Sequence, residues 1–493
     1  MAGPPLVPEP GFVPPPPPKG DRILPRIATC VAVTLALALL GFGIGSVLHD
    51  NGPQFPAEWD ARVQPFIDFV EKTRGLEFKH PVAVYFLSPE QYRRAALGGD
   101  GGAPSTDPEK EAQSTGIGRA FGLIEGELDL KKAGETLADS GTLAYYSSDA
   151  KIVNVKGTEL TVGLRVTLVH ELTHALQDQY FDLNARFARG DSEQNLVLRS
   201  VVEGDAVTIE NRYVEQLSDT DKRRYDEESS AGRDAAMADL GKVPTALVAL
   251  QAIPYAIGRP YVGMVEATGG TANDTKALDD LMRNLPDDTS RLFTPGDDAE
   301  RRKVEPPKLG TGEPLQSDSV GAYGLYIQLA ERIDPLVAID AVDGWRGDAF
   351  VAAQDAPSPG AEEKICVAAN FEMATEKDGK ELRDSLELWK AAMPAEAAIT
   401  IGGEAATATM RSCDPGTATK SDDRSSLEAL GYPGGRLDIA TALLLDGDDP
   451  SVANCIADQA VRKLTIEELQ ADELSGARQT EIAGLLKDLR ADC

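Results

Sequence analysis

The sequence is poor in aromatic residues, cysteine, histidine and positive charge. Each shortage limits the fold, the chemistry or the partners that the protein can have. Its 493 residues include 49 Lys and Arg against 80 Asp and Glu, a formal net charge of −31. A nucleic-acid-binding protein needs a basic surface to displace counterions, so we expect no nucleic-acid partner. Aromatic residues make up only 6% of the chain, which predicts cores built from Ala, Val and Leu. Five cysteines in a chain of this length exclude a small disulfide-framework protein.

Histidine occurs only four times, so any histidine chemistry draws on very few residues. Two of the four, His170 and His174, belong to an HExxH motif. The surrounding residues 158–180 show the most regular helical spacing of apolar side chains in the chain. On a helix, side chains four positions apart share one face, so both imidazoles can reach a single ion. The motif therefore predicts a metal site on this helix.

Zinc hydrolysis is the chemistry that this motif indicates. Neutral imidazole nitrogens are good zinc ligands, and Glu171 lies beside the ion, where it can act as general base. A catalytic zinc needs a third protein ligand and one open position. No histidine follows the motif, so a carboxylate must serve unless His49 or His80 folds back. Glu203, in the apolar sequence VVEGDA of a predicted helix at 193–216, is the leading candidate, because a buried carboxylate needs a partner.

Neighbouring residues are expected to complete the site. Asp178 and Asp205 are candidates to hold the ligand histidines through hydrogen bonds. Gly204 is expected to let the HExxH helix and the Glu203 helix approach closely. Tyr255, or alternatively Tyr261, can stabilise an oxyanion through its phenol, because no further histidine is available. For each aspartate and tyrosine the alternative is an ordinary helix-face acid or a packed ring.

A membrane anchor is predicted over residues 27–48, which contain no charge and are long enough to span a bilayer. Lys19, Arg22 and Arg26 precede them, so the positive-inside rule places the N-terminus in the cytoplasm and the remainder outside. A cleaved signal peptide is the alternative, opposed by the long apolar run and the tail before it. That tail, residues 1–26, has nine prolines in its first 18 positions and is predicted to be disordered.

Four of the five cysteines fall on the predicted extracytoplasmic side, where disulfides form. Three pairings are possible. We favour the sequential one, Cys366 with Cys413 and Cys455 with Cys493, because each pair flanks a local structural pattern.

The pattern of apolar residues predicts several further elements. Residues 56–74 are expected to be helical, 81–87 a strand and 98–111 a loop. Residues 143–155 are expected to form a hairpin, and its edge can pair with an extended peptide. The predicted regions are a main domain at 53–345, a small α/β region at 346–425 and a helical region at 426–493.

The segment HELTHALQD at 170–178 resembles the zinc-site helix of the thermolysin-like gluzincins. The order PVAVYFLS, YYSSDAKIVNV, HELTHALQDQ and EGDA resembles bacterial membrane-anchored metallopeptidases of the peptidase-MA-like group, over roughly residues 60–345. The resemblance implies an α+β, zincin-like fold, with a small mixed sheet, a helical half and the metal in the cleft between them. It implies the ligands His170, His174 and Glu203, with Glu171 as general base. The Asn and Asp found near the third ligand of thermolysin are not reproduced around Glu203.

We therefore expect a single-pass, membrane-anchored zinc peptidase with one zinc ion per chain, acting on a peptide or protein outside the membrane. One alternative is a non-catalytic envelope protein whose zinc site is structural or vestigial and whose working surface is 346–493. Another is an intramembrane zinc protease, opposed by Arg165 within the motif helix.

Overall fold

The computed structural model describes most of the chain after residue 54. The predicted tail 1–26 and the predicted anchor 27–48 lie outside the described residues, as does most of the predicted loop 98–111. Within the described part, no helix combines the length and the apolar character needed to cross a membrane. The described residues are 55–96, 107–139, 143–269, 275–297, 299–310, 313–358, 360–420, 425–471 and 474–493.

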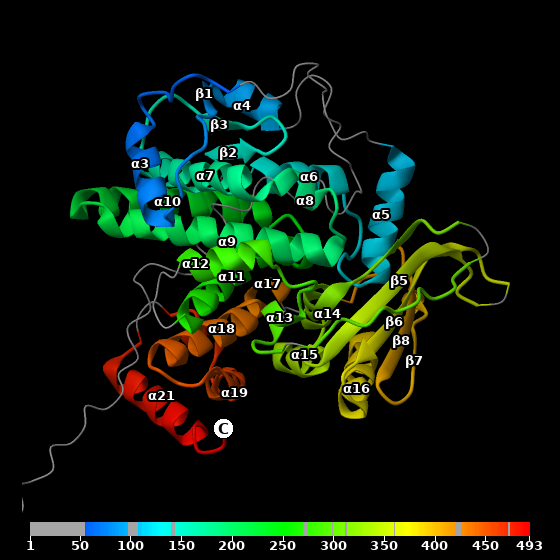
Figure 1. Cartoon of the computed structure of the whole chain (residues 1–493). Helices are drawn as coiled ribbons and strands as arrows, with labels where there is room; N and C mark the ends of the chain where they lie inside the picture. The colour runs from blue at the N-terminus through cyan, green and yellow to red at the C-terminus, as the bar shows by residue number, and fades with distance from the viewer. Residues whose placement is uncertain are drawn as a thin grey trace, which may run out of the picture.

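The described residues form the expected α+β fold, with a three-stranded sheet, a five-stranded sheet and helices packed around both (Figure 1). The strands are β1 (Ala83–Leu87), β2 (Ala144–Ser147), β3 (Ile152–Lys156), β4 (Gln316–Asp318), β5 (Trp345–Asp355), β6 (Lys364–Met373), β7 (Thr400–Gly402) and β8 (Thr407–Cys413). The helices of the first half are α3 (Gln64–Arg74), α4 (Pro89–Ala96), α5 (Pro108–Ala120), α6 (Leu130–Asp139), α7 (Val162–Phe181), α8 (Leu183–Phe187), α9 (Ser192–Gln216), α10 (Asp219–Leu240) and α11 (Thr245–Thr268). Those of the second half are α12 (Thr275–Arg283), α13 (Ser290–Phe293), α14 (Gly321–Ala330), α15 (Pro335–Val342), α16 (Glu376–Ala392), the 3-10 helix η2 (Ala395–Ala397), α17 (Ser426–Ala429), α18 (Gly431–Leu445), α19 (Pro450–Val461), α20 (Ile466–Leu469) and α21 (Gly476–Leu489).

The three-stranded sheet has the order β1-β3-β2. β1 pairs with β3 in parallel, and β2 pairs with β3 antiparallel, so the predicted strand and hairpin are both present. Val153 and Val155 are fully buried on the face toward the helices. β2 forms an edge of this sheet and lies over α7 (Figure 1).

Two long helices, α7 and α9, carry the HExxH motif and Glu203. α7 begins at a cap in which Thr161 Oγ1 accepts a hydrogen bond from the backbone N–H of Leu164. It ends at Asp182, whose backbone is left-handed (φ 49°). α9 begins with a capping box between Asp191 and Gln194. Both helices match the predicted ranges to within a few residues.

Tertiary packing holds α7 between the small sheet and α9. Its leucines at positions 164, 168, 172 and 176 are all buried, and they share a core with β3 and α3. Full burial of one such side chain contributes about 1.5–3 kcal/mol. Val197, Leu198, Val201 and Val202 of α9 belong to a second, larger core. The motif helix and the Glu203 helix thus lie where the two cores meet.

Glycines bring α9 close to α11, and not to α7 as the sequence suggested for Gly204. A Cβ atom on Gly204 would lie 2.2 Å from the carbonyl oxygen of Gly258, and one on Gly258 would lie 2.0 Å from that of Ser200. Real Cβ atoms do not approach this closely. The backbones of α9 and α11 therefore touch directly beside Glu203.

The five-stranded sheet has the order β4-β5-β6-β8-β7. One disulfide joins Cys366 of β6 to Cys413, its register partner in β8. The other joins Cys455 of α19 to Cys493, the last residue. The predicted sequential pairing is confirmed.

The larger core runs across the boundaries predicted at 345 and 425. It contains residues from all three predicted regions, including Val201, Val367 and Leu443. Some predicted element bounds were also wrong. The helix expected over 56–74 begins at Gln64, and residues 108–111, expected in a loop, start α5.

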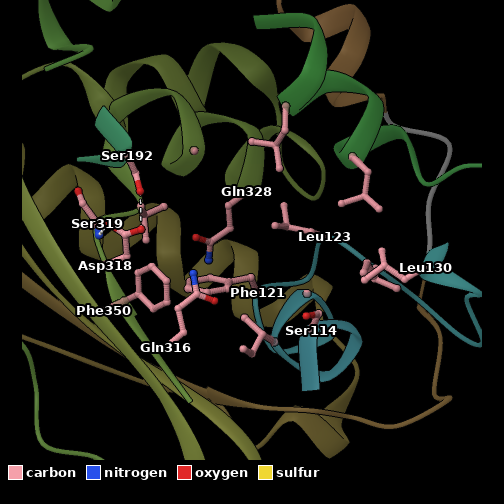
Figure 2. A pocket seen from close by; sticks show the side chains of 17 residues that line it. Ser114, Phe121, Leu123, Leu130, Ser192, Gln316, Asp318, Ser319, Gln328 and Phe350 are labelled. Atoms are coloured by element: carbon pink, nitrogen blue, oxygen red, sulfur yellow. Dashed lines mark hydrogen bonds between the residues drawn. The ribbon is translucent and has the colours of Figure 1, made fainter. Parts of the chain in front are cut away.

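A cavity of about 200 Å³ lies between α5, α11, α14 and β5 (Figure 2). Its lining is mainly apolar, and Phe121 and Phe350 meet edge to face there, with ring centroids 5.2 Å apart. Gln328 reaches into it from α14 (Figure 2). The Gln328 Oε1 atom is buried and has no hydrogen-bond partner among the described residues.

Candidate metal centre

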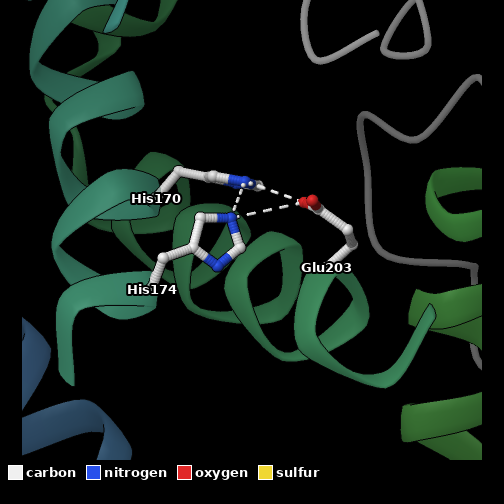
Figure 3. A group of neighbouring side chains, drawn as sticks. All are labelled: His170, His174 and Glu203. Carbon is white, nitrogen blue, oxygen red and sulfur yellow. Dashed lines mark hydrogen bonds and ion pairs between the residues drawn. The ribbon is translucent and has the colours of Figure 1, made fainter. Parts of the chain in front are cut away.

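His170, His174 and Glu203 meet between α7 and α9 (Figure 3). The Nε2 atoms of the two imidazoles are 3.0 Å apart. Glu203 Oε2 lies 3.2 Å from Nε2 of His170 and 3.4 Å from Nε2 of His174. The three side chains are 5%, 12% and 11% exposed, so the group is nearly enclosed. The structure therefore brings together the three residues expected as ligands, and together they can hold a metal ion.

The second nitrogen of each imidazole has its own partner. His170 Nδ1 donates to Glu210 Oε2 at 3.0 Å, and His174 Nδ1 donates to Gln177 Oε1 at 3.0 Å. Such contacts select the tautomer that leaves Nε2 free for a metal. Sequence reasoning missed both partners. Glu210 follows Glu203 by seven positions, two helical turns, and this spacing on one face was the available signal.

Gln177 extends its contact into a buried polar network. Its Nε2 donates to Asp205 Oδ2 at 2.9 Å, and Arg74 Nε donates to the same oxygen at 2.9 Å. Arg74 also binds Asp279 at 2.7 Å. Arg74 and Asp205 are nearly inaccessible to solvent. Asp205 was expected to contact a ligand histidine directly. It instead contacts Gln177, which in turn contacts His174.

Asp178, the other expected partner of a ligand histidine, is placed differently. Its Oδ2 accepts hydrogen bonds from the Tyr146 hydroxyl and from Lys151 Nζ, both at 2.6 Å. Its Oδ1 accepts from the backbone N–H of Leu183 at 3.0 Å. The carboxylate therefore ties the β2–β3 hairpin to α7, because it sits on the side of α7 that faces the small sheet.

Glu171 links the motif helix to the edge strand. Its Oε2 accepts the backbone N–H of Tyr146 in β2 at 2.7 Å, while its Oε1 makes no hydrogen bond with a described residue. Burial raises the pKa of the Glu171 carboxyl, partly offset by the neighbouring His170 and His174. A carboxylate with a raised pKa holds a proton more readily, as a general base must.

The buried charges of the centre depend on one another. Burial opposes ionisation of Glu203, but His174 and His170 outweigh it, so the pKa of the Glu203 carboxyl lies well below its usual value. Burial likewise opposes protonation of His170, but Glu203 and Glu210 outweigh it and raise the pKa of that imidazole. The carboxylates thus create a site of negative potential that suits a cation.

Tyr255 and Arg199 are neighbours of Glu203. The hydroxyl of Tyr255, on α11, donates to Glu203 Oε1 at 3.2 Å. Arg199, one helical turn before Glu203, interacts electrostatically with both Glu203 and Tyr255. Sequence reasoning missed Arg199, although its i, i+4 spacing to Glu203 was visible. Tyr261 is packed in the larger core, so of the two candidate tyrosines Tyr255 is the one brought to the group.

No protein-family model, curated protein or solved structure matches the chain.

Proposed function

We propose that this chain is a membrane-anchored zinc peptidase that hydrolyses peptide bonds outside the membrane. One observation carries the proposal. The HExxH histidines and a distant glutamate converge on one point, while the motif's own glutamate stays off that point and faces an edge strand. A purely structural metal site would need a fourth protein ligand to close it. Such a ligand is absent from the metal-binding group found among the described residues.

The ligand spacing fits zinc. Tetrahedral ligands at bond lengths of about 2.0–2.1 Å lie roughly 3.3 Å from one another. The three separations in the centre are 3.0, 3.2 and 3.4 Å. Two imidazoles and one carboxylate are also a known ligand set of catalytic zinc. A zinc ion bound here would supply Lewis acidity, polarising a substrate carbonyl and lowering the pKa of water to about 7.

Glu171 would then act as general base. Its Oε1 would accept a proton from the attacking water as the oxygen bonds to the carbonyl carbon. The same proton would pass to the amide nitrogen as the C–N bond breaks, which yields a carboxylic acid and an amine. The contact with the Tyr146 N–H orients the carboxylate and leaves Oε1 for this work. The Tyr255 hydroxyl donates its one proton to Glu203 Oε1 in this structure, and it would turn from that oxygen to the oxyanion to stabilise it.

The edge strand β2 would position the substrate. It lies at the edge of its sheet and contacts the motif glutamate. An extended peptide can add to such an edge through backbone hydrogen bonds. A substrate bound there would run past the metal centre.

The fold assignment and the location belong to the same proposal. The small sheet, the motif helix and the helical half bearing Glu203 are in keeping with a zincin-like fold of the peptidase-MA-like group. Residues 27–48 would anchor the chain in the lipid bilayer with its N-terminus in the cytoplasm. The disulfides Cys366–Cys413 and Cys455–Cys493 suit an oxidising compartment outside the membrane.

Metal content and cleavage test the proposal together. The full chain, purified in detergent, should hold about one zinc per chain by elemental analysis. Glu203→Ala should lose the metal. Glu171→Gln should keep the metal but lose cleavage of a peptide library, because only the base is removed. A folded chain that binds no zinc after reconstitution would refute the peptidase and favour a non-catalytic envelope protein.

A further inference from the structure

Arg199 is a half-buried cation without a hydrogen bond or an ion pair among the described residues, and it lies beside the metal centre. The buried arginines of the described chain behave differently. Arg74, Arg332 and Arg436 are all ion-paired. A buried guanidinium whose N–H donors form no hydrogen bond is costly. The carboxylate of Glu203 acts on Arg199 electrostatically, but no described residue takes up the N–H donors, which leaves them for a ligand.

The position of Arg199 on α9 places its side chain near the metal centre. It precedes Glu203 by four residues on α9, so the two side chains share one face of the helix. It interacts electrostatically with Glu203 and with Tyr255 of α11. Glu203 and Tyr255 both border the metal centre.

The aromatic ring of Phe187 contacts the Arg199 guanidinium without occupying its N–H donors. The Cζ atom of Arg199 lies 5.9 Å from the ring centroid of Phe187 in α8. A cation–π contact uses the face of the ring and forms no N–H···O bond. The five N–H donors of the guanidinium therefore stay available. Burial lowers the pKa of Arg199, yet arginine stays charged at neutral pH because its usual value is so high.

We infer that Arg199 binds a carboxylate of the peptide substrate beside the metal centre. This inference rests on the proposed function and names its substrate class, peptides with a carboxylate close to the scissile bond. The planar guanidinium fork matches a carboxylate in a bidentate pair. A neutral substrate would leave the guanidinium N–H donors without a carboxylate to bind, whereas an acidic one satisfies them.

The carboxylate can come from two sources, the C-terminus of the substrate or an Asp or Glu side chain. A degenerate peptide library made as free acids and again as C-terminal amides distinguishes the first source. A parallel library with Asp and Glu replaced by Asn and Gln distinguishes the second. Both sets are offered in competition to the zinc-loaded full-length Glu171→Gln chain, and bound peptides are measured by mass spectrometry. This readout needs no turnover.

The chain should enrich the carboxylate-bearing members of one pair of libraries about 10- to 100-fold, the range for a charge-assisted bidentate pair. Arg199→Met, added to Glu171→Gln, should abolish the enrichment and keep the zinc. Arg199→Lys should retain part of it, because an ammonium keeps the charge but loses the fork. Arg189→Met is the matched control, because Arg189 is exposed, and its enrichment should equal that of the parent.

Two results would overturn the inference. One is equal binding of acidic and neutral peptides by the parent chain, which needs no variant and so survives any folding defect of Arg199→Met. The other is a loss of cleavage in Arg199→Met, in the Glu171 background, that is equal for acidic and neutral peptides and confined to kcat. That result would assign Arg199 to the oxyanion or to positioning Glu203. If zinc itself does not bind, the proposed function fails first, and the zinc measurement separates that case.

Discussion

Both nitrogens of each histidine in the metal centre have a defined neighbour. Nε2 faces Glu203, while Nδ1 donates to Glu210 in one imidazole and to Gln177 in the other. Such outer partners fix the ring orientation and make the ligand more basic. Because Glu210 also carries a negative charge, we expect the loss of Glu210 to weaken metal binding more than the loss of Gln177.

Glu210→Gln should lower zinc affinity about 10- to 100-fold, the range for outer partners of ligand histidines. The amide keeps the shape of the side chain but removes the charge that favours the N–H···O contact with His170. Competition against a chelator measures the affinity. Glu215→Gln is the control, because Glu215 is exposed on the same helix. Equal affinities for the two variants would show that Glu210 does not tune the metal.

At the scale of elements, the centre depends on how α7, α9 and α11 pack. α7 supplies the two candidate ligand histidines and the proposed base Glu171. α9 supplies the third candidate ligand and Arg199, and α11 supplies Tyr255. The position of α9 against α11 is set by the backbone contact at Gly204 and Gly258. A displacement of α9 would carry Glu203 away from the histidines.

Gly258→Ala should destabilise the protein by about 1–3 kcal/mol or more, the usual cost of overpacking. Its new Cβ would overlap the Ser200 carbonyl oxygen, and α9 must shift to relieve the overlap. Zinc affinity should fall as well. Gly263→Ala on the same helix is the control. Its Cβ would meet only a Thr441 methyl carbon at 3.9 Å, so the change should be neutral or stabilise by up to about 1 kcal/mol.

Chemical denaturation measures both stabilities, and the chelator assay measures the metal. If Gly258→Ala were as stable as Gly263→Ala, the close approach of the two helices would not be needed for the fold.

Over the whole molecule, α9 connects the metal centre to the five-stranded sheet. Glu193, in the first turn of α9, is 2% exposed. It accepts hydrogen bonds from the backbone N–H and the hydroxyl of Thr289, at 3.0 and 2.6 Å. Burial raises its pKa to about 7, with the nearby carboxylate of Asp348 adding to the effect. The first turn of α9 thus contains an acid, Glu193, whose ionisation destabilises the folded state.

This raised pKa predicts that stability falls as the pH rises. Above the usual value of 4.5 the unfolded chain loses the proton, whereas the folded chain keeps it until about pH 7. The folded state therefore binds more protons over this interval, and the free energy of unfolding decreases from about pH 4.5 to pH 7. The full loss is up to about 3 kcal/mol from a shift of this size.

Urea denaturation at several pH values should show this slope, and Glu193→Gln should flatten it because the amide does not titrate in this range. Glu109→Gln, at an exposed position of α5, should leave the slope unchanged. An identical slope in Glu193→Gln would assign the pH dependence to other groups.

Features that depend on local spacing along the chain could be predicted from the residues alone. The HExxH pair shares a face because four residues make about one helical turn, and the hairpin and the disulfide pairs follow from segments close in the chain. The role of Glu203 could also be predicted from the sequence, because a carboxylate inside an apolar stretch needs a partner.

The distant side chains that complete the centre could be identified only in the folded chain. Arg74 and Asp205 are 131 positions apart, and Tyr255 is 52 from Glu203. Such contacts depend on the angle and rotation at which helices pack, and local spacing does not specify these. For the same reason Asp178 faces the hairpin and not a ligand histidine, Gly204 faces α11 and not α7, and the contacts of Glu210 and Arg199 emerged only from the folded chain.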